Sequence, residues 1–433
     1  MTEHWYTSDR FRACALAFLA IASVAQAFPL FQRDNDYVWH TNVGSSFLAG
    51  EPYGAGGEWY PVSRAMFDAL PALFPKFVGK GLIALLALAS LVYCFRAFAE
   101  MTRDESTREP RRNFAACIFA FGAMAPYINR DLDDAGLQLL LLGMLTLGGI
   151  ALWRGRPWIA GFWLGTGVAY KFTPILFLPV LLWKRQWRAA TALVVVTFAW
   201  GLAPAAFVGW DKTLACQQLW WARLVSNTRI QDIAENGIEP PSTSNQGLMA
   251  VFARYLRTYP EGHPLRLEHP LSISFAAFDQ DTSRMLAKGG FLALALAIAW
   301  GMRRPWKTHD PRLPYEWAVV CIFTALISPM CWRQHLVLSV PAGFLLWRSL
   351  LAAPKISPRL LCLAIALATA VVFPQRELWG REFTEVLFFY KLDTLALLGY
   401  TALMFHLAPA FSMAQSALTP VAAPAPSADR RAA

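Results

Sequence analysis

The chain has 433 residues, of which 56% are hydrophobic and only 16% are charged, and its mean hydropathy is +0.36. Soluble domains carry about 25% charged residues, so this composition excludes an ordinary soluble protein. Apolar runs of spanning length recur from Phe11 to Leu407, which predicts one polytopic, all-α membrane domain over residues 1–410. The formal net charge of +10 does not indicate nucleic acid binding, because the basic residues lie in short loops instead of one stripe.

The apolar runs predict about 11 to 12 membrane segments. The first ends in Ala25-Gln26-Ala27, which resembles a signal-peptidase site. We expect this segment to be retained, because the apolar run continues to Phe31 and candidate chemistry follows it directly. The expected segments are 11–31, 78–98, 113–128, 135–153, 157–170, 172–183, 189–208, 285–302, 315–328, 335–350, 359–374 and 386–407.

Basic residues concentrate in one set of alternate loops, which the positive-inside rule assigns to the cytoplasm. Both termini are expected on that side, and residues 411–433, rich in Ala, Pro and Ser, are expected to form a disordered cytoplasmic tail. The opposite side carries two long segments, 32–77 and 209–284. A functional site is therefore expected on the outer, periplasmic face of the plasma (inner) membrane.

Segments 157–170 and 172–183 are each too short to cross a hydrocarbon core of about 30 Å. Together they predict a re-entrant hairpin that turns at Lys171. Non-helical backbone at membrane depth survives only beside protein or a watery cavity, so the turn indicates a cavity. Lys171 is expected to face it and hold a phosphate, although a lysine that extends to the outer surface explains the residue equally well.

Two carboxylates, Asp34 and Asp36, follow the first membrane segment directly. If this stretch is helical, Asp36 and His40 share a face, and Val43, Phe47 and Leu48 give it an apolar side. Asp36 is the candidate general base for a sugar-acceptor hydroxyl, with Asp34 as the second choice. The alternative is that both are ordinary loop charges or helix N-caps.

A polar run, Ser328 to His335, separates two apolar segments at the outer face. Arg333 and His335 can both donate to a phosphate oxygen, whereas a capped interhelical turn is the structural alternative.

The remaining candidates for binding sugar or acceptor lie in three outer segments. They could bind sugar hydroxyls, but a solvated turn or simple packing explains them as well. The short turn 129–134 is followed by the next helix, and Asn245-Gln246 precedes an amphipathic stretch at 248–255. These candidates are Arg130, Asp131, Asp134, Gln138, His40, Asn245 and Gln246.

No metal site, cofactor or disulfide framework is implied, because the seven cysteines are scattered without any C-x-x-C spacing. A divalent cation at Asp131, Asp133 and Asp134 is possible, but no spacing demands one. No P-loop or G-x-G-x-x-G fingerprint provides a nucleotide site.

Four short motifs, taken in order, resemble glycosyltransferase family 87, whose members are polytopic enzymes of the GT-C class. The motifs are Asp36 through Gly50-Glu51-Pro52-Tyr53, Gly165 through Pro174, Ser244 through Leu248, and Ile327 through Leu336. The likeness covers roughly 30–350. Where many members carry a Gly-Gln-x-Asn run, this chain has Asp131 to Gln138, which leaves the donor and the acceptor open.

The resemblance implies a GT-C fold and a polyprenyl-phosphate sugar donor, with mannose as the sugar. It matches the family's proposed catalytic base to Asp36, and its embedded lysine and outer-loop histidine to Lys171 and His335. It implies transfer to a lipid or glycan acceptor, with membrane lipids as further partners.

The residue inventory fits this chemistry. A lipid phosphate leaves as a stable anion, so cations can replace the acid that glycoside hydrolysis needs. One base then suffices, and in-line displacement inverts the anomeric centre. The alternatives are a transporter or flippase of a lipid-linked saccharide, and a structural scaffold that would leave Lys171 unexplained.

Overall fold

The structure is a computed structural model that describes residues 5–18, 36–54, 59–103, 109–228, 244–256, 276–353 and 357–418. Throughout these ranges the regular secondary structure is helical, as the apolar runs predict. The first expected segment, 11–31, lies mostly outside the described residues, and so do Asp34 and residues 419–433.

Helices follow one another along nearly the whole described chain. Their order is η1 (Trp5–Thr7), α2 (Asp36–Leu48), α3 (Ser63–Ala72), α4 (Lys76–Met101), α5 (Glu109–Asp133), α6 (Leu137–Trp153), α7 (Pro157–Tyr170), η3 (Thr173–Leu176), α8 (Phe177–Trp183), α9 (Trp187–Leu202), α10 (Ala205–Val208), α11 (Trp210–Thr228), α12 (Leu248–Leu256), α14 (Gln280–Gly301), α15 (Leu313–Leu326), η4 (Arg333–Ser339), α16 (Val340–Ala352), α17 (Pro358–Val372), α18 (Arg376–Phe389) and α19 (Leu392–Leu418).

Helices able to cross a membrane are fewer than the expected segments. By length and composition there are four among the described residues, or six if each of two bent pairs is one span. The pairs are α5 with α6, bent by 117°, and α17 with α18, bent by 86°. Shorter apolar helices match three more of the expected segments: Thr173–Trp183, Leu313–Leu326 and Leu392–Ala408. The chain is an all-α polytopic membrane protein.

One expected segment is wrong. The segment expected at 386–407 is broken, because α18 ends at Phe389 and Lys391 adopts a φ of 55° before α19 begins. A hydropathy pattern does not register this break, since it depends on backbone geometry and not on apolar content. Helix α19 continues to Leu418, and the disordered tail expected over 411–433 stays a prediction.

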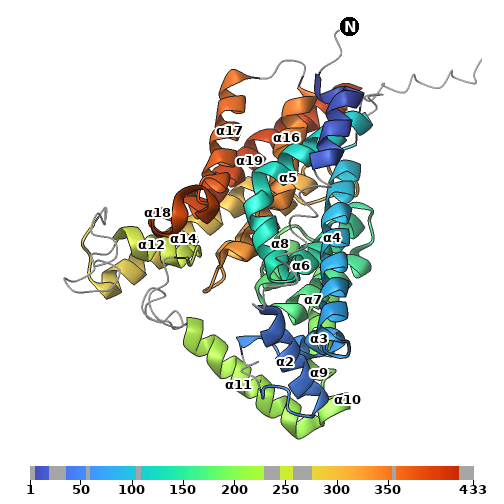
Figure 1. Ribbon diagram of the computed structural model, residues 1–433, viewed down its shortest axis with the longest axis vertical. Coiled ribbons are helices and arrows are strands. Elements are labelled where there is room, and N and C mark those ends of the chain that lie inside the picture. Colours follow the sequence, from blue (N-terminus) through green and yellow to red (C-terminus); the bar gives the residue numbers. More distant parts are fainter. Residues whose placement is uncertain are drawn as a thin grey trace, which may run out of the picture.

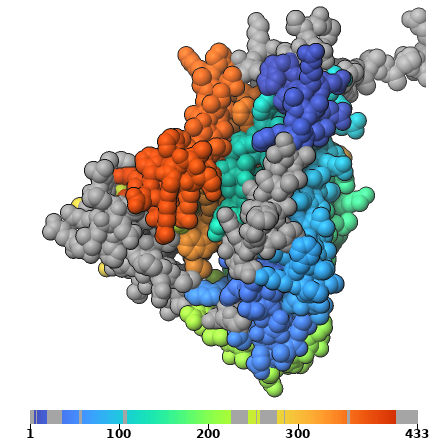
Figure 2. Space-filling model, in the orientation of Figure 1, coloured from blue at the N-terminus to red at the C-terminus, as the bar shows by residue number. Residues whose placement is uncertain are grey.

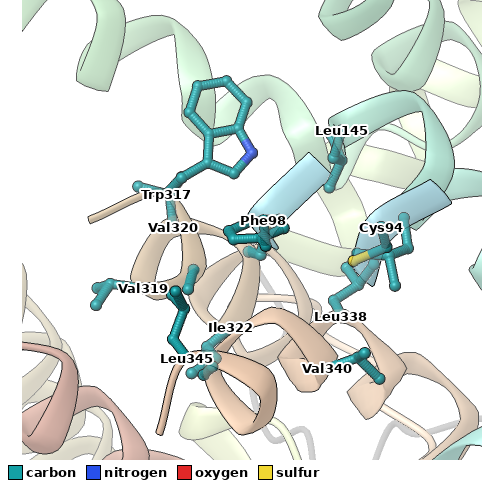
Figure 3. Close-up of a cluster of buried hydrophobic side chains, with 14 of the residues drawn as sticks. Cys94, Phe98, Leu145, Trp317, Val319, Val320, Ile322, Leu338, Val340 and Leu345 are labelled. Atoms are coloured by element: carbon teal, nitrogen blue, oxygen red, sulfur yellow. The ribbon is translucent and has the colours of Figure 1, made fainter. Parts of the chain in front are cut away.

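The buried core lies where α15, η4 and α16 pack against α4 and α6. Figure 3 shows this region, with Trp317, Val320 and Ile322 of α15 near Phe98 of α4 and Leu345 of α16. All of α15 is buried in the protein, which explains its continuous apolar sequence.

The basic loops meet at one end of the molecule, as the alternation of charge predicts. Contacts between loops far apart in sequence establish this: Arg154 with Glu100 at 2.6 Å, Arg111 with Asp9 at 3.6 Å, the His309 amide with the Trp153 carbonyl at 2.9 Å, and Lys184 Nζ with the Arg304 carbonyl at 2.9 Å. Figure 1 shows the described N-terminal residues at one end and α2, α3 and α11 at the other.

The expected hairpin is present in α7, η3 and α8. Its first arm starts beside Thr308, because a Cβ placed on Gly155 would lie 3.1 Å from the Thr308 hydroxyl. Its second arm ends at Lys184, which binds Glu316 and the carbonyl of Arg304. The start of the first arm and the end of the second arm therefore both lie against residues 304–316. Lys171 lies at the opposite end, where the hairpin turns.

The segments expected as outer loops contain helices α2, α3, α11 and α12. The amphipathic stretch expected at 248–255 is confirmed as α12. In α2, Val43 and Phe47 are buried against the protein and Leu48 is 52% exposed, so the expectation that this apolar side lies in the membrane interface stays a prediction. In the space-filling view of Figure 2, α2 to α4 form the lower end and the C-terminal helices form one flank.

Candidate active site

Asp36 is the first residue of α2, and its carboxylate lies at the positive end of that helix. Its side chain is exposed. Gln334 of η4 approaches it from the far end of the sequence, with Nε2 3.5 Å from Asp36 Oδ2, at the long limit of a hydrogen bond. The fold therefore brings the first outer segment to the polar run before α16.

One turn along α2, His40 is buried against α3. Its Nδ1 lies 2.9 Å from Asp68 Oδ2, and Arg64 Nε donates to Asp68 Oδ1 at 2.8 Å. Arg64 Nη2 is also 3.2 Å from His40 Nδ1. Because Asp68 can only accept, the shorter contact makes Nδ1 a donor in the neutral ring, and the guanidinium beside it is a charge neighbour. The expected role of His40 as a sugar ligand stays a prediction, and its contact with Asp68 occupies Nδ1.

The charges in this group shift its titration. Burial alone would raise the pKa of Asp68, but Arg64 and His40 hold that pKa below its ordinary value. Burial lowers the pKa of His40, and Arg64 lowers it further, although Asp68 and Asp36 act in the opposite direction. His40 is therefore neutral and Asp68 ionised at neutral pH.

Close contact between α2 and α3 depends on Gly44. A Cβ at this position would lie 2.1 Å from the backbone oxygen of Asp68, much closer than atoms can approach. The absent side chain lets α3 approach until Asp68 reaches His40. The ion network of His40, Arg64 and Asp68 therefore depends on the close packing of the two helices at Gly44.

Lys171 ends α7 in an extended conformation, with φ of −152° and ψ of 129°. Phe172 returns to helical backbone and η3 begins at Thr173, so the break in the helix is confined to Lys171. The side chain is buried, and Nζ donates to Gln138 Oε1 at 3.0 Å. This position rules out extension to the outer surface, which was the structural alternative for Lys171.

The candidate sugar-binding residues in the turn before α6 make contacts within the protein. Asp131 accepts from the backbone amides of Gln138 and Leu139 at 2.9 and 2.8 Å, so it caps α6. Arg130 Nη2 lies 3.7 Å from Asp134 Oδ2. The turn itself uses Ala135 and Gly136 with positive φ. These contacts give the turn a structural task, and sugar binding by these residues stays a prediction.

His335 lies in η4 and is buried. Its Nδ1 accepts from the Trp332 amide at 3.2 Å, so the neutral ring carries its proton on Nε2 and can donate to an anion. Arg333 instead turns to α19, where Nε lies 3.2 Å from Asp393 Oδ2, and it donates to the carbonyls of Pro374 and Val371. A bound donor phosphate would have to share Arg333 with these partners.

Asn245 and Gln246 connect the segment before α12 to its neighbours. Asn245 accepts from the Cys331 amide at 3.1 Å and donates to the Pro329 carbonyl at 2.9 Å. Gln246 donates to the Phe388 carbonyl at 3.2 Å. These contacts shape the polar run that carries His335, and direct binding of sugar by either residue stays a prediction.

The structure thus gathers Asp36, Lys171 and His335 from three distant parts of the chain. Arg64 donates to the carbonyl of Tyr170, the residue before Lys171, and lies beside His40 of α2, so contacts connect the helix of Asp36 to the turn of Lys171. Arg64 and Asp68 were missed by the sequence reading. Their spacing of four, in an outer segment with apolar neighbours Ala65, Phe67 and Ala69, is the signal that could have found them.

Within the described ranges, no group of three or more His, Cys, Asp or Glu side chains is arranged to hold a metal ion.

An apolar helical bundle that holds a buried lysine, a buried histidine and an exposed carboxylate defines a membrane protein with a polar site. Residues 59–329 match the model of Glycosyltransferase family 87. The chain belongs to this family. The matched region includes Lys171, Arg64 and Asp68, whereas Asp36 and His335 lie outside it.

A curated relative from Mycobacterium tuberculosis is named polyprenol-phosphate-mannose-dependent alpha-(1-2)-phosphatidylinositol mannoside mannosyltransferase. It is 32% identical to this chain over 205 residues. The alignment covers 45% of this chain and 39% of the relative, so the chain spans well under half of that protein's length. No solved structure matches the chain.

Proposed function

We propose that this protein transfers a hexose, with mannose as the first candidate, from a polyprenyl phosphate to a lipid or glycan acceptor. The printed name of the mycobacterial relative supports a polyprenyl-phosphate mannose donor and a glycolipid acceptor. The reaction would take place on the outer face of the plasma membrane, with both termini in the cytoplasm. The basic loops gathered at the opposite end of the molecule support this orientation.

The observation that carries the mechanism is the contact of Asp36 with Gln334, the residue that precedes His335 in η4. Asp36 is exposed, so an acceptor hydroxyl can reach its carboxylate. In the proposed reaction Asp36 takes the proton of that hydroxyl as the oxygen attacks the anomeric carbon. The bond from that carbon to the phosphate oxygen breaks, and the configuration inverts.

Lys171 and His335 would stabilise the phosphate as it leaves. Lys171 Nζ has Gln138 as its hydrogen-bond acceptor, and an ammonium has three hydrogens, so it can also donate to a phosphate. His335 offers Nε2. Donors fixed by the fold before the reaction stabilise a developing anion most effectively, because they need no reorganisation.

Sugar transfer in detergent tests the proposal. Purified protein would be incubated with radiolabelled polyprenyl-phosphate mannose and a crude lipid extract, and products would be separated by chromatography. Label that moves to a new lipid with the wild type but not with Asp36→Asn supports the mechanism. Donor binding without any transfer by the wild type would instead indicate another sugar or another acceptor.

A further inference from the structure

A buried arginine connects the helix that carries Asp36 to the turn that carries Lys171. Arg64 is 1% exposed, so it does not touch substrate. Its Nε donates to Asp68, its Nη2 lies beside His40, and its Nη1 donates to the carbonyl of Tyr170 at 3.4 Å. One guanidinium therefore contacts α2, α3 and the end of α7.

On the α2 side, the network fixes the helix one turn after the proposed base. Asp68 accepts from Arg64 with one oxygen and from His40 with the other. Residues four apart lie on the same helix face, so Asp36 is the neighbour of His40 along α2. Any rotation of α2 that moved Asp36 would break the contact of His40 with Asp68.

On the hairpin side, the network fixes the backbone immediately before Lys171. Ser63 Oγ donates to the Ala169 carbonyl at 2.8 Å, and the guanidinium of Arg64 lies 3.8 Å from the centre of the Tyr170 ring. The Tyr170 hydroxyl donates to the Leu137 carbonyl at 3.0 Å, next to the glutamine that holds Lys171.

We propose that Arg64 is a positioning residue that holds Asp36 and Lys171 in a fixed relation, so that base and donor phosphate meet the same sugar. This inference rests on the proposed function, which supplies the roles of Asp36 and Lys171. The planar fork of arginine is essential to it, since lysine keeps the charge but cannot contact three groups in these directions.

The first test compares Arg64→Lys with Arg312→Lys. Arg312 also pairs with a buried carboxylate, Asp310, at 2.6 Å, but at the opposite end of the hairpin. Misplacing reacting groups by about 1 Å can lower a rate about 100-fold, so a fall of that order in kcat is expected for Arg64→Lys. Its Kd for polyprenyl-phosphate mannose should change by less than about threefold, and Arg312→Lys should keep wild-type kcat.

The second test separates positioning from general support of the fold. Arg64→Lys is combined with Asp36→Glu, which retains a carboxylate and displaces it by one methylene. If Arg64 acts by placing Asp36, the double variant is hardly slower than the slower single variant. If the fall in kcat of the double variant equals the product of the two single falls, the proposal is overturned.

Hydrogen exchange of the full-length protein gives a readout that needs no activity. Arg64→Lys should speed amide exchange in α2 and in residues 167–173 together, whereas Arg312→Lys should leave both segments unchanged. Unchanged exchange around Lys171 in Arg64→Lys would overturn the connection. If Asp36→Asn keeps wild-type turnover, the proposed base is wrong, while the exchange result still decides whether Arg64 joins the two segments.

A milder variant keeps the inference testable if Arg64→Lys does not fold. Ser63→Ala removes only the bond to the Ala169 carbonyl and preserves the ion network. A loss of one hydrogen bond of about 1 kcal/mol corresponds to a fall in kcat of about fivefold. This fall should also disappear in the Asp36→Glu background, and its persistence there would contradict the proposal.

Discussion

Gln334 and Asp36 are 298 positions apart in the chain, yet Nε2 of one lies 3.5 Å from Oδ2 of the other. The contact joins the first outer helix to the 3-10 helix that carries His335. Asp36 is exposed and Gln334 is buried, so the pair marks a place where the start of α2 meets η4. The proposed chemistry depends on this meeting.

Asp36→Asn should abolish most turnover without loss of donor affinity. A positioned general base contributes about 10²- to 10⁴-fold, so kcat is expected to fall by that range while the donor Kd stays near the wild-type value. Asp211→Asn is the matched control, because Asp211 is also an exposed carboxylate in the first turn of an outer helix. Equal kcat for Asp36→Asn and Asp211→Asn would show that Asp36 is not the base.

Lys171→Met should weaken donor binding. Hydrogen bonds to charged groups contribute about 1.5 to 3 kcal/mol, so the donor Kd is expected to rise by about 10- to 100-fold. The control is Lys212→Met, since Lys212 is an outer lysine whose Nζ pairs with Glu51 at 2.9 Å and whose side chain is 52% exposed. Equilibrium binding of labelled donor measures both variants. Equal affinity of Lys171→Met and wild type would contradict a phosphate role for this lysine.

Gly44→Ala should destabilise the protein and lower turnover. The added Cβ would meet the Asp68 carbonyl at 2.1 Å, so α2 and α3 must separate. Overpacking of this kind costs about 1 to 3 kcal/mol. Gly122→Ala provides the comparison, because nothing lies within 4 Å of a Cβ at that helical position. Thermal unfolding in detergent should show a lower midpoint for Gly44→Ala only, and a similar midpoint in both would refute the close-packing argument.

The pKa of His40 makes stability depend on pH. Burial and Arg64 lower that pKa in the folded protein, below the ordinary value of 6.5. As pH falls below 6.5, the unfolded chain binds a proton at this histidine that the folded protein does not, so stability decreases. Above 6.5 both states are neutral at His40 and the effect is absent.

His40→Gln should therefore reduce the loss of stability that occurs as pH falls below 6.5. Unfolding midpoints measured from pH 7.5 to 5 should fall less steeply for His40→Gln than for the wild type. His309→Gln controls for a histidine at the other end of the molecule, beside Trp153. A curve for His40→Gln parallel to that of the wild type would show that His40 does not titrate as described.

Patterns along the chain were enough to predict the class of fold and the hairpin at residues 157–183, and they supplied the candidates for the proposed reaction. Apolar length, alternation of basic loops and the rarity of charge at membrane depth are local or periodic features, so they can be read along the chain. Lys171 is an example, because a lysine between two apolar runs is unusual wherever the rest of the chain lies.

The contacts that the candidate side chains make within the fold became known only from the tertiary structure. Asp131, Asn245 and Arg333 were equal candidates in sequence, yet their groups cap a helix, connect loops or pair with Asp393. The positioning role proposed for Arg64 rests on its contacts with Tyr170, which is 106 positions away in the chain. Hydrogen-bond partners depend on distances between segments far apart in the chain, and local residue patterns contain no record of those distances.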